Sequence, residues 1–329
     1  MALEIGCIFP PTVDTPEHLA LAERLGYAYG AVFDSPTLFA DPWLTLGRAA
    51  ERTSRIRLGV CCITPYLRHV VATASALATL DALAPGRIDL VIGAGFTGQH
   101  MLGRGPGRWA DVEAYAGALR GLLADEEVEW DGAVLGLRYS PRTGLNVPCQ
   151  IPIWIAAHGP KGVGVAERVG DVIMTDPSHG LGARSSVLPV FVNIFCTVLE
   201  EGEELSAERV RDAAGPYAAF QLHLAGEGVV SHLPEWADYR REIEAIDPRR
   251  RHLETHRMHL IDVTERERPL ITPELITQAT HTGTAAHVRG RLEELEADGV
   301  SGVLYGPQGG DLPRELEAFA RAAGLSGTR

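Results

Sequence analysis

The loop Gly159-Pro160-Lys161, with His158 before it and Gly162 after it, has the residue types of an anion-binding site. A glycine lets the backbone approach a ligand, and a proline fits the first position of a helix, where its missing N–H is not needed. A helix that begins here would direct its free N–H groups at an anion. Lys161 is also the only lysine among the 30 lysine and arginine residues of the chain. The loop therefore predicts a site for an anion such as a phosphate, with a solvated lysine in the first helical turn as the alternative.

The predicted ends of the strands contain few side chains that can transfer a proton. Asp34 and Asp176 are the only carboxylates expected at the same strand ends as this loop, and His69 and His158 are the nearest histidines. For His69, a hydrogen-bonded position at a helix start is favoured over catalysis, whereas His158 either contacts a ligand or faces solvent. Such a site suits a cofactor that brings its own reactivity.

The sequence does not indicate metal-assisted or serine-dependent hydrolysis. No two histidines have metal-ligand spacing on one strand, and the chain has no G-x-S-x-G motif. His256 and His259 lie in a polar region predicted to be helical, where the helix surface is favoured over a position across the mouth of the site. The sequence therefore predicts no metal site.

Eight short apolar runs alternate with helical patterns along the chain. They are predicted as strands at residues 3–9, 31–33, 56–63, 87–92, 153–157, 171–174, 190–199 and 302–305. Continuous apolar runs are typical of parallel strands that are buried on both faces. The α/β alternation with few hairpin patterns predicts a (β/α)8 TIM barrel, with a doubly wound sheet as the alternative.

A polar stretch without strand patterns interrupts the alternation before the last strand, at about residues 206–270. We expect a mainly helical insertion in a single domain that covers residues 1–329. Together with the long loop after the fourth strand, this insertion would set the substrate.

That loop begins with Gly93-Ala94-Gly95-Phe96-Thr97-Gly98, which matches the G-x-G-x-x-G fingerprint of dinucleotide-binding proteins. Three strand–helix units precede the motif, and no strand ends in an acid about 20 residues later. Further glycines follow the motif, so no helix is expected to open at its third glycine. We expect these glycines to let a flat ring or a substrate approach the backbone.

Composition limits the partners and the compartment. The net charge of −13 argues against a nucleic-acid or anionic-membrane surface, and the run at residues 188–199 is too short to cross a bilayer. The five cysteines are odd in number and contain no C-x-x-C pair. With no targeting segment recognised, a reducing cytoplasm fits best.

The chain resembles the luciferase-like monooxygenase superfamily, in particular the branch of methylenetetrahydromethanopterin reductase and other coenzyme F420-dependent oxidoreductases. The residues that carry the resemblance span most of the chain: 58–69 (LGVCCITPYLRH), Gly86-Arg87-Ile88 with 93–95, 156–161 (AAHGPK) and Gly283-Thr284. The resemblance implies a homodimeric barrel whose deazaflavin or flavin lies across the strand ends.

The resemblance also implies the site residues. Those expected to bind the cofactor are Asp34, Cys61, Cys62, Thr64, Gly95, Ala156, Ala157, His158, Gly159, Pro160, Lys161, Gly162, Thr175 and Asp176. The 159–161 loop would hold the cofactor phosphate. A cis peptide bond between Cys61 and Cys62 would form a bulge against the ring, with an ordinary trans bond as the alternative. Asp34 and His69 are the candidates for catalysis, and no catalytic group is assigned beyond them.

Two departures from the family bear on the cofactor. Ser35 stands where some deazaflavin sugar-phosphate dehydrogenases have a histidine, so that catalytic role is not transferred. Ala94 stands where luciferase-type flavin enzymes have a phosphate-binding arginine, which favours F420 over FMN.

The resemblance implies hydride transfer between F420 and a small organic substrate. One alternative is a luciferase-like monooxygenase that uses reduced FMN and oxygen. A second is a barrel that binds a flavin-like ligand without catalysis.

Overall fold

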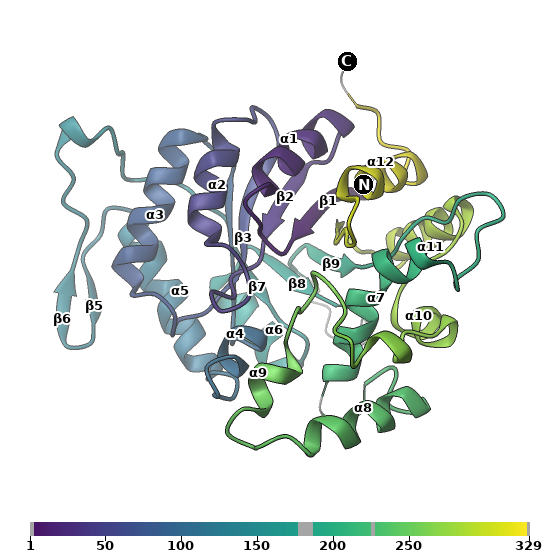
Figure 1. The fold of residues 1–329 in the computed structure, drawn as a ribbon. Helices are drawn as coiled ribbons and strands as arrows, with labels where there is room; N and C mark the ends of the chain where they lie inside the picture. Colours follow the sequence, from purple (N-terminus) through teal and green to yellow (C-terminus); the bar gives the residue numbers. More distant parts are fainter. Residues whose placement is uncertain (1–2, 177–186, 225–227, 328–329) are drawn as a thin grey trace.

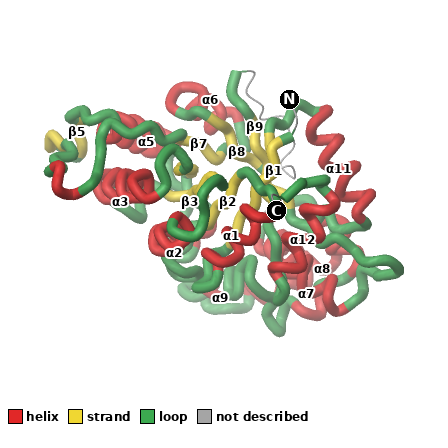
Figure 2. Tube along the Cα trace, turned by 90° about the horizontal axis from the view of Figure 1, so that it is seen from above, coloured by secondary structure: helices red, strands yellow, loops and turns green. Residues whose placement is uncertain are grey.

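The computed structural model describes residues 3–176, 187–224 and 228–327. Its eight barrel strands are parallel and close in the order β1-β10-β9-β8-β7-β4-β3-β2, with helices around the outside (Figures 1 and 2). Their bounds are β1 Glu4–Phe9, β2 Tyr29–Val32, β3 Arg57–Ile63, β4 Ile88–Gly93, β7 Ile153–Ala156, β8 Val172–Thr175, β9 Val190–Ile194 and β10 Gly302–Tyr305. The predicted (β/α)8 barrel is confirmed, and the alternative of a doubly wound sheet is wrong.

Side chains from every strand fill the inside of the barrel. The residues of this inner cluster are Ile8, Ala31, Cys61, Val91, Trp154, Met174, Phe191 and Leu304, one from each strand. Trp154 and Phe191 bring their ring centroids to 4.6 Å, so large side chains occupy the axis. The interior is a packed core, and a ligand site has to lie at an end of the barrel.

A second apolar layer lies between the barrel and its helices. The helices are α1 Thr15–Leu25, α2 Pro42–Ala50, α3 Val70–Leu83, α4 Thr97–His100, α5 Trp109–Leu123, α6 Pro160–Val169, α7 Glu208–His223, α8 Pro234–Glu244, α9 Arg251–Thr255, α10 Pro273–Ala279, α11 Ala285–Ala297 and α12 Leu312–Ala322. At the start of α2, the Asp41 carboxylate accepts hydrogen bonds from the N–H groups of Trp43 and Leu44 at 2.9 and 3.0 Å. Such caps fix where a helix begins, and with it the preceding loop at the strand end.

Two local predictions need correction. The strand predicted at 190–199 ends at Ile194, because residues 195–197 instead exchange hydrogen bonds with residues 281–283. The stretch 124–150 contains an antiparallel hairpin, β5 Val128–Trp130 and β6 Ala133–Leu135, which was not predicted. Its turn is Asp131-Gly132, both with positive φ, and an Asp-Gly pair of this kind is a strong hairpin pattern.

The expected helical insertion before the last strand is present but extends beyond residue 270: it comprises α7 to α10, with a short 3-10 turn at Arg268–Leu270. The insertion packs around a buried cluster of its own, which includes Val210, Ala218, Tyr239 and Leu275. Figure 1 shows α7 and α9 beyond the same end of the barrel as α4. Within the described ranges, no helix combines the length and apolar character needed to cross a membrane.

Candidate active site at the strand ends

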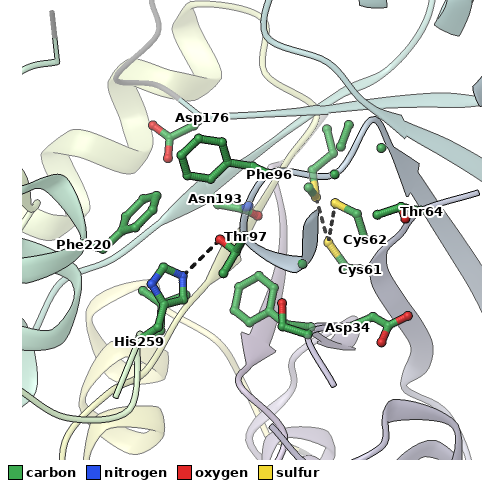
Figure 3. A pocket seen from close by; sticks show the side chains of 18 of the residues that line it. Asp34, Cys61, Cys62, Thr64, Phe96, Thr97, Asp176, Asn193, Phe220 and His259 are labelled. Carbon is green, nitrogen blue, oxygen red and sulfur yellow. Dashed lines mark hydrogen bonds between the residues drawn. The ribbon is translucent and has the colours of Figure 1, made fainter. Parts of the chain in front are cut away.

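A cavity of about 390 Å³ opens at the carboxyl ends of the strands (Figure 3). This volume lies within the usual range for small-molecule sites. The lining includes residues from the ends of six barrel strands and a wall from the insertion: Asp34, Cys61, Cys62, Thr64, Gly93, Gly95, Ala156, His158, Met174, Asp176, Asn193, Phe195, Tyr217, Phe220, Gln221 and His259. Eight of these were predicted to bind the cofactor: Asp34, Cys61, Cys62, Thr64, Gly95, Ala156, His158 and Asp176.

Small residues form one side of the cavity. The peptide bond between Cys61 and Cys62 is cis, as predicted, and the β3–β4 register shifts between Val60 and Ile63. A Cβ atom added to Gly93 would lie 3.5 Å from the Cβ atoms of Cys62 and Ala156, so these side chains meet closely. This surface has no long side chain that would exclude a flat ring.

Gly95 lies next to this surface, and its position in the backbone requires a glycine. Its φ is +81°, and an added Cβ would lie 2.7 Å from Cγ2 of Thr64. Both the backbone conformation and the close approach exclude a larger residue without local movement. No helix was expected to open at the third glycine of this motif, Gly98, but the four-residue α4 begins one residue earlier, at Thr97, and contains Gly98. The closed barrel nonetheless excludes a dinucleotide-binding sheet.

Asp34 is the carboxylate in the cavity lining whose pKa is clearly shifted. It follows β2 and is only 7% exposed. Burial, together with the nearby Asp41 charge, raises its pKa to about 6, and the Arg68 charge opposes this increase. No described residue donates a hydrogen bond to its carboxylate. A carboxyl group that titrates close to neutral pH can give or accept a proton during catalysis.

The insertion forms the opposite wall with aromatic residues. The Tyr217 hydroxyl donates a hydrogen bond to Oδ2 of Asp176 at 2.7 Å, which joins α7 to the end of β8. The Tyr217 ring stacks on Phe195 with centroids 3.9 Å apart. Burial and the Asp176 charge raise the Tyr217 pKa well above its ordinary value, so the phenol stays protonated. Sequence reasoning missed Tyr217 and Phe220, because a helical pattern does not show which neighbour the helix will contact.

Two buried acceptors in the lining have no hydrogen-bond partner among the described residues. They are Oδ1 of Asn193 and Oε1 of Gln221. A buried polar atom without a partner is unfavourable, so a ligand that donates N–H or O–H groups would stabilise this site. The cavity thus fits a planar ring with polar edges.

The predicted anion loop lies at the rim. Pro160 occupies the first turn of α6, as predicted, and Lys161 is exposed without an ion pair to any described residue. His158 lines the cavity, and its Nδ1 lies 3.1 Å from Oγ1 of Thr175. Gly162 packs against Trp109, another lining residue, since an added Cβ would lie 2.6 Å from that ring. A phosphate held by the loop would therefore extend outward from the cavity.

Three other predicted residues lie outside the lining. Ala157 and Thr175 are buried behind the wall. His69 is exposed at the N-cap of α3, where its Nδ1 accepts a 3.3 Å hydrogen bond from the N–H of Val71. This capping position matches the interpretation favoured from the sequence rather than a role in catalysis.

The expectation that His256 and His259 lie on a helix surface is wrong. They are 1% and 4% exposed, because α9 ends at Thr255 and the chain then turns back against α7. His259 lines the cavity, and its Nε2 lies 3.4 Å from Oγ1 of Thr97 (Figure 3). Burial lowers the pKa of His256 to about 3 and that of His259 well below its ordinary value, so both rings are neutral at pH 7.

A closed parallel barrel with a ligand cavity at its strand ends is the arrangement of barrel enzymes. The sequence profile of the luciferase-like monooxygenase family matches residues 10–302, and the chain belongs to this family. An F420-dependent glucose-6-phosphate dehydrogenase from Beutenbergia cavernae is 38% identical over 152 residues, which are 43% of this chain and 43% of that protein. The match thus spans less than half the length of this relative.

Solved structures share the fold over nearly the whole chain. The coenzyme F420 dependent tetrahydromethanopterin reductase from Methanopyrus kandleri has a TM-score of 0.74 at 18% identity, over 99% of this chain and 100% of that one. The oxygenating constituent of 3,6-diketocamphane monooxygenase from Pseudomonas putida, in complex with FMN, has a TM-score of 0.64 at 15% identity, over 98% of each chain. At such identities, the similarity is one of fold.

Proposed function

We propose that the protein is an oxidoreductase that binds coenzyme F420 in the strand-end cavity and transfers a hydride between it and a small organic substrate. The observation that carries the proposal is the cavity itself, with its small-residue surface at Cys61-Cys62 and the unpartnered acceptors Asn193 and Gln221. The F420 dependence of the Beutenbergia cavernae relative supports the cofactor assignment.

The chain would position the reactants and supply one proton-transfer group, Asp34. The surface at Cys61, Cys62, Gly93 and Ala156 would seat the ring, and Asn193 and Gln221 would accept hydrogen bonds from its edge. A bound deazaflavin supplies the two-electron chemistry. Asp34 would exchange the proton that accompanies the hydride, and the aromatic wall from α7 would exclude water.

A second candidate function is an FMN-dependent monooxygenase. The FMN complex of the 3,6-diketocamphane monooxygenase, which shares the fold, supports it. The absence of an arginine at Ala94, the first residue after β4, favours F420 instead.

Titration with each cofactor tests the proposal. Fluorescence should show saturable binding of F420, and FMN should bind more weakly. Tighter binding of FMN, with oxygen consumption when reduced FMN is supplied, would favour the monooxygenase. If neither cofactor binds to the folded protein, both enzyme functions are wrong and only a barrel for another ligand remains.

Lys161→Ala should weaken F420 binding by about 10- to 100-fold, as expected for the loss of one charge-assisted contact to a phosphate. Because Lys161 is exposed, the thermal unfolding temperature should hardly change. Arg168→Ala is the matched control, since it removes an exposed positive charge from the other end of α6. Equal affinities of the Lys161 variant and this control would refute the phosphate role.

We also propose that the protein has one domain, forms a homodimer and lies in the cytoplasm, as expected from the sequence. The substrate would be selected by the insertion, because Tyr217 and Phe220 contribute to the cavity wall. Ser35 also lines the cavity beside Asp34, so the proton relay of a histidine-bearing sugar-phosphate dehydrogenase is not transferred.

A further inference from the structure

Three histidines from separate parts of the insertion converge at the cavity wall. His223 ends α7, His256 follows α9, and His259 lies in the next turn. They are 4%, 1% and 4% exposed, and one ring nitrogen from each lies within 4.8 Å of the others. Buried histidines that meet in this way have the composition of a transition-metal site.

The distance between two of the rings matches that of metal ligands. Nδ1 of His256 and Nδ1 of His259 are 3.4 Å apart. Two nitrogens bound tetrahedrally to zinc at about 2.0–2.1 Å are separated by about 3.3 Å. As a direct hydrogen bond between the two rings, 3.4 Å would be long.

The orientation of His223 leaves one nitrogen free to bind an ion. Its Nε2 lies 2.6 Å from Oε1 of Glu267, while its Nδ1 is buried without a hydrogen-bond partner among the described residues. The Glu267 carboxylate is itself fixed by the hydroxyl and N–H of Thr264, at 2.7 and 2.9 Å. A histidine whose outer N–H is held by a carboxylate is the usual arrangement of a metal ligand.

His259 has a longer and weaker outer contact, at 3.4 Å. Its Nδ1 faces His256, and its Nε2 faces the Thr97 hydroxyl (Figure 3). A ring that donates from Nε2 to this hydroxyl keeps the Nδ1 lone pair available.

A metal-free cluster leaves these features unexplained. An unpartnered nitrogen of His223 at 2% side-chain exposure is unfavourable, and the long contact between His256 and His259 offsets little of that cost. A cation shared by the three nitrogens would satisfy all of them.

We propose that His223, His256 and His259 together bind one divalent transition-metal ion, with Zn²⁺ as the reference ion and a water at the fourth position. The ion would tie the end of α7 to the turn after α9. Because His259 lines the cavity and α7 carries Tyr217, the metal would fix the cavity wall. This inference does not depend on the identity of the redox cofactor.

Metal binding can be measured directly on the full chain, purified without a histidine tag and stripped with a chelator. Titration should show one Zn²⁺ bound per chain, and Co²⁺ in its place should give the visible absorption bands of a four-coordinate site. Zn²⁺ should also raise the unfolding temperature, because it binds only the folded cluster.

Single substitutions His223→Ala, His256→Ala and His259→Ala should each lower Zn²⁺ affinity by at least about 100-fold, and Glu267→Gln by about 10- to 100-fold. His287→Ala is the control, since this histidine is exposed on α11 and should leave binding unchanged. Circular dichroism would check that each variant is folded. Wild-type protein that binds no more Zn²⁺ than the cluster variants would overturn the proposal.

Crystals of the wild-type protein grown with Zn²⁺ give a test that needs no variant. An anomalous peak between the three histidines would support the site. A zinc ion found only at surface residues, or no peak at all, would overturn it.

Discussion

Replacing Asp34 with asparagine is expected to slow hydride transfer by about 10²- to 10⁴-fold, the usual effect of removing a positioned proton-transfer group. Asparagine keeps the size and shape of the side chain but cannot accept or release the proton. Single-turnover reduction of bound F420 by substrate would measure this step apart from cofactor affinity. F420 affinity should change little, because asparagine leaves the shape of the cavity unchanged.

The pH dependence gives this prediction a direction. The pKa of Asp34 is about 6, raised by burial and by Asp41. For substrate oxidation the ionised carboxylate accepts the proton, so the rate should rise with pH through about 6 and then level off. In the reverse direction the protonated form donates, so the rate should fall above about pH 6. Asp34→Asn should remove this limb in both directions.

The stability of the same variant separates catalysis from folding. The native pKa of Asp34 lies above its unfolded value of 3.8, so between these pH values the native state binds more protons. The stabilisation that the protonated Asp34 side chain gives to the folded state is therefore present at acid pH. It is lost as the pH rises through about 6, because the buried carboxyl group then ionises. Asparagine carries no such cost, and the variant should unfold at pH 8 no more easily than the wild type.

Asp14→Asn is the matched control, because Asp14 is exposed before α1 and does not line the cavity. It should leave the rate unchanged. An Asp34→Asn enzyme within about threefold of the wild-type rate would show that proton transfer uses another group. Tyr217, held by Asp176, would then be the next residue to test.

The barrel could be predicted because each of its strands is marked by a pattern within a few consecutive residues. A parallel strand buried on both faces is a continuous apolar run, and the last strand at residues 302–305 was predicted with its observed bounds. Once the strands are placed, their carboxyl ends define the site, and the positions of Asp34, Cys61 and Gly95 follow from that placement. The cis bond between Cys61 and Cys62 could be predicted only from the family resemblance.

The contacts that the insertion makes with the cavity and within itself could not be predicted in the same way. Tyr217 reaches the cavity only because its hydroxyl bonds to Asp176, 41 residues earlier in the chain. His223 and Glu267 are 44 residues apart, and His223 also lies far along the chain from the pair His256 and His259. These contacts depend on how α7 and the turn after α9 pack, and amphipathic periodicity does not specify that packing. The Asp131-Gly132 hairpin differs, since its turn residues are a local pattern that could have been used.

The second large effect is expected at the other end of the barrel. Arg57, the first residue of β3, donates two hydrogen bonds of 2.8 Å to the carboxylate of Asp89 in β4. Trp154 in β7 donates a third through Nε1 at 3.3 Å, so the network joins three strands. Asp89 is 4% exposed, and burial raises its pKa although Arg57 and Trp154 act in the opposite direction.

Arg57→Ala should lower the free energy of unfolding by about 3 kcal/mol, because it leaves a buried carboxylate with only the Trp154 N–H. This estimate is at the low end for buried pairs, since the Arg57 side chain is 30% exposed. Urea unfolding would measure the change. The loss should be smaller at acid pH, because removal of Arg57 raises the pKa of Asp89 further and the native state then takes up a proton.

Two comparisons identify the buried charge as the cause of this loss. Arg57→Ala combined with Asp89→Asn should be less destabilising than the sum of the two single changes, because no uncompensated charge remains. Arg241→Ala, which breaks the exposed pair with Asp238, should cost less than about 1 kcal/mol. Additive losses from Arg57→Ala and Asp89→Asn would instead mean that each residue stabilises the barrel through its own packing. Because this network lies at the start of the strands and the cavity at their ends, cofactor affinity of the folded variants should stay close to that of the wild type.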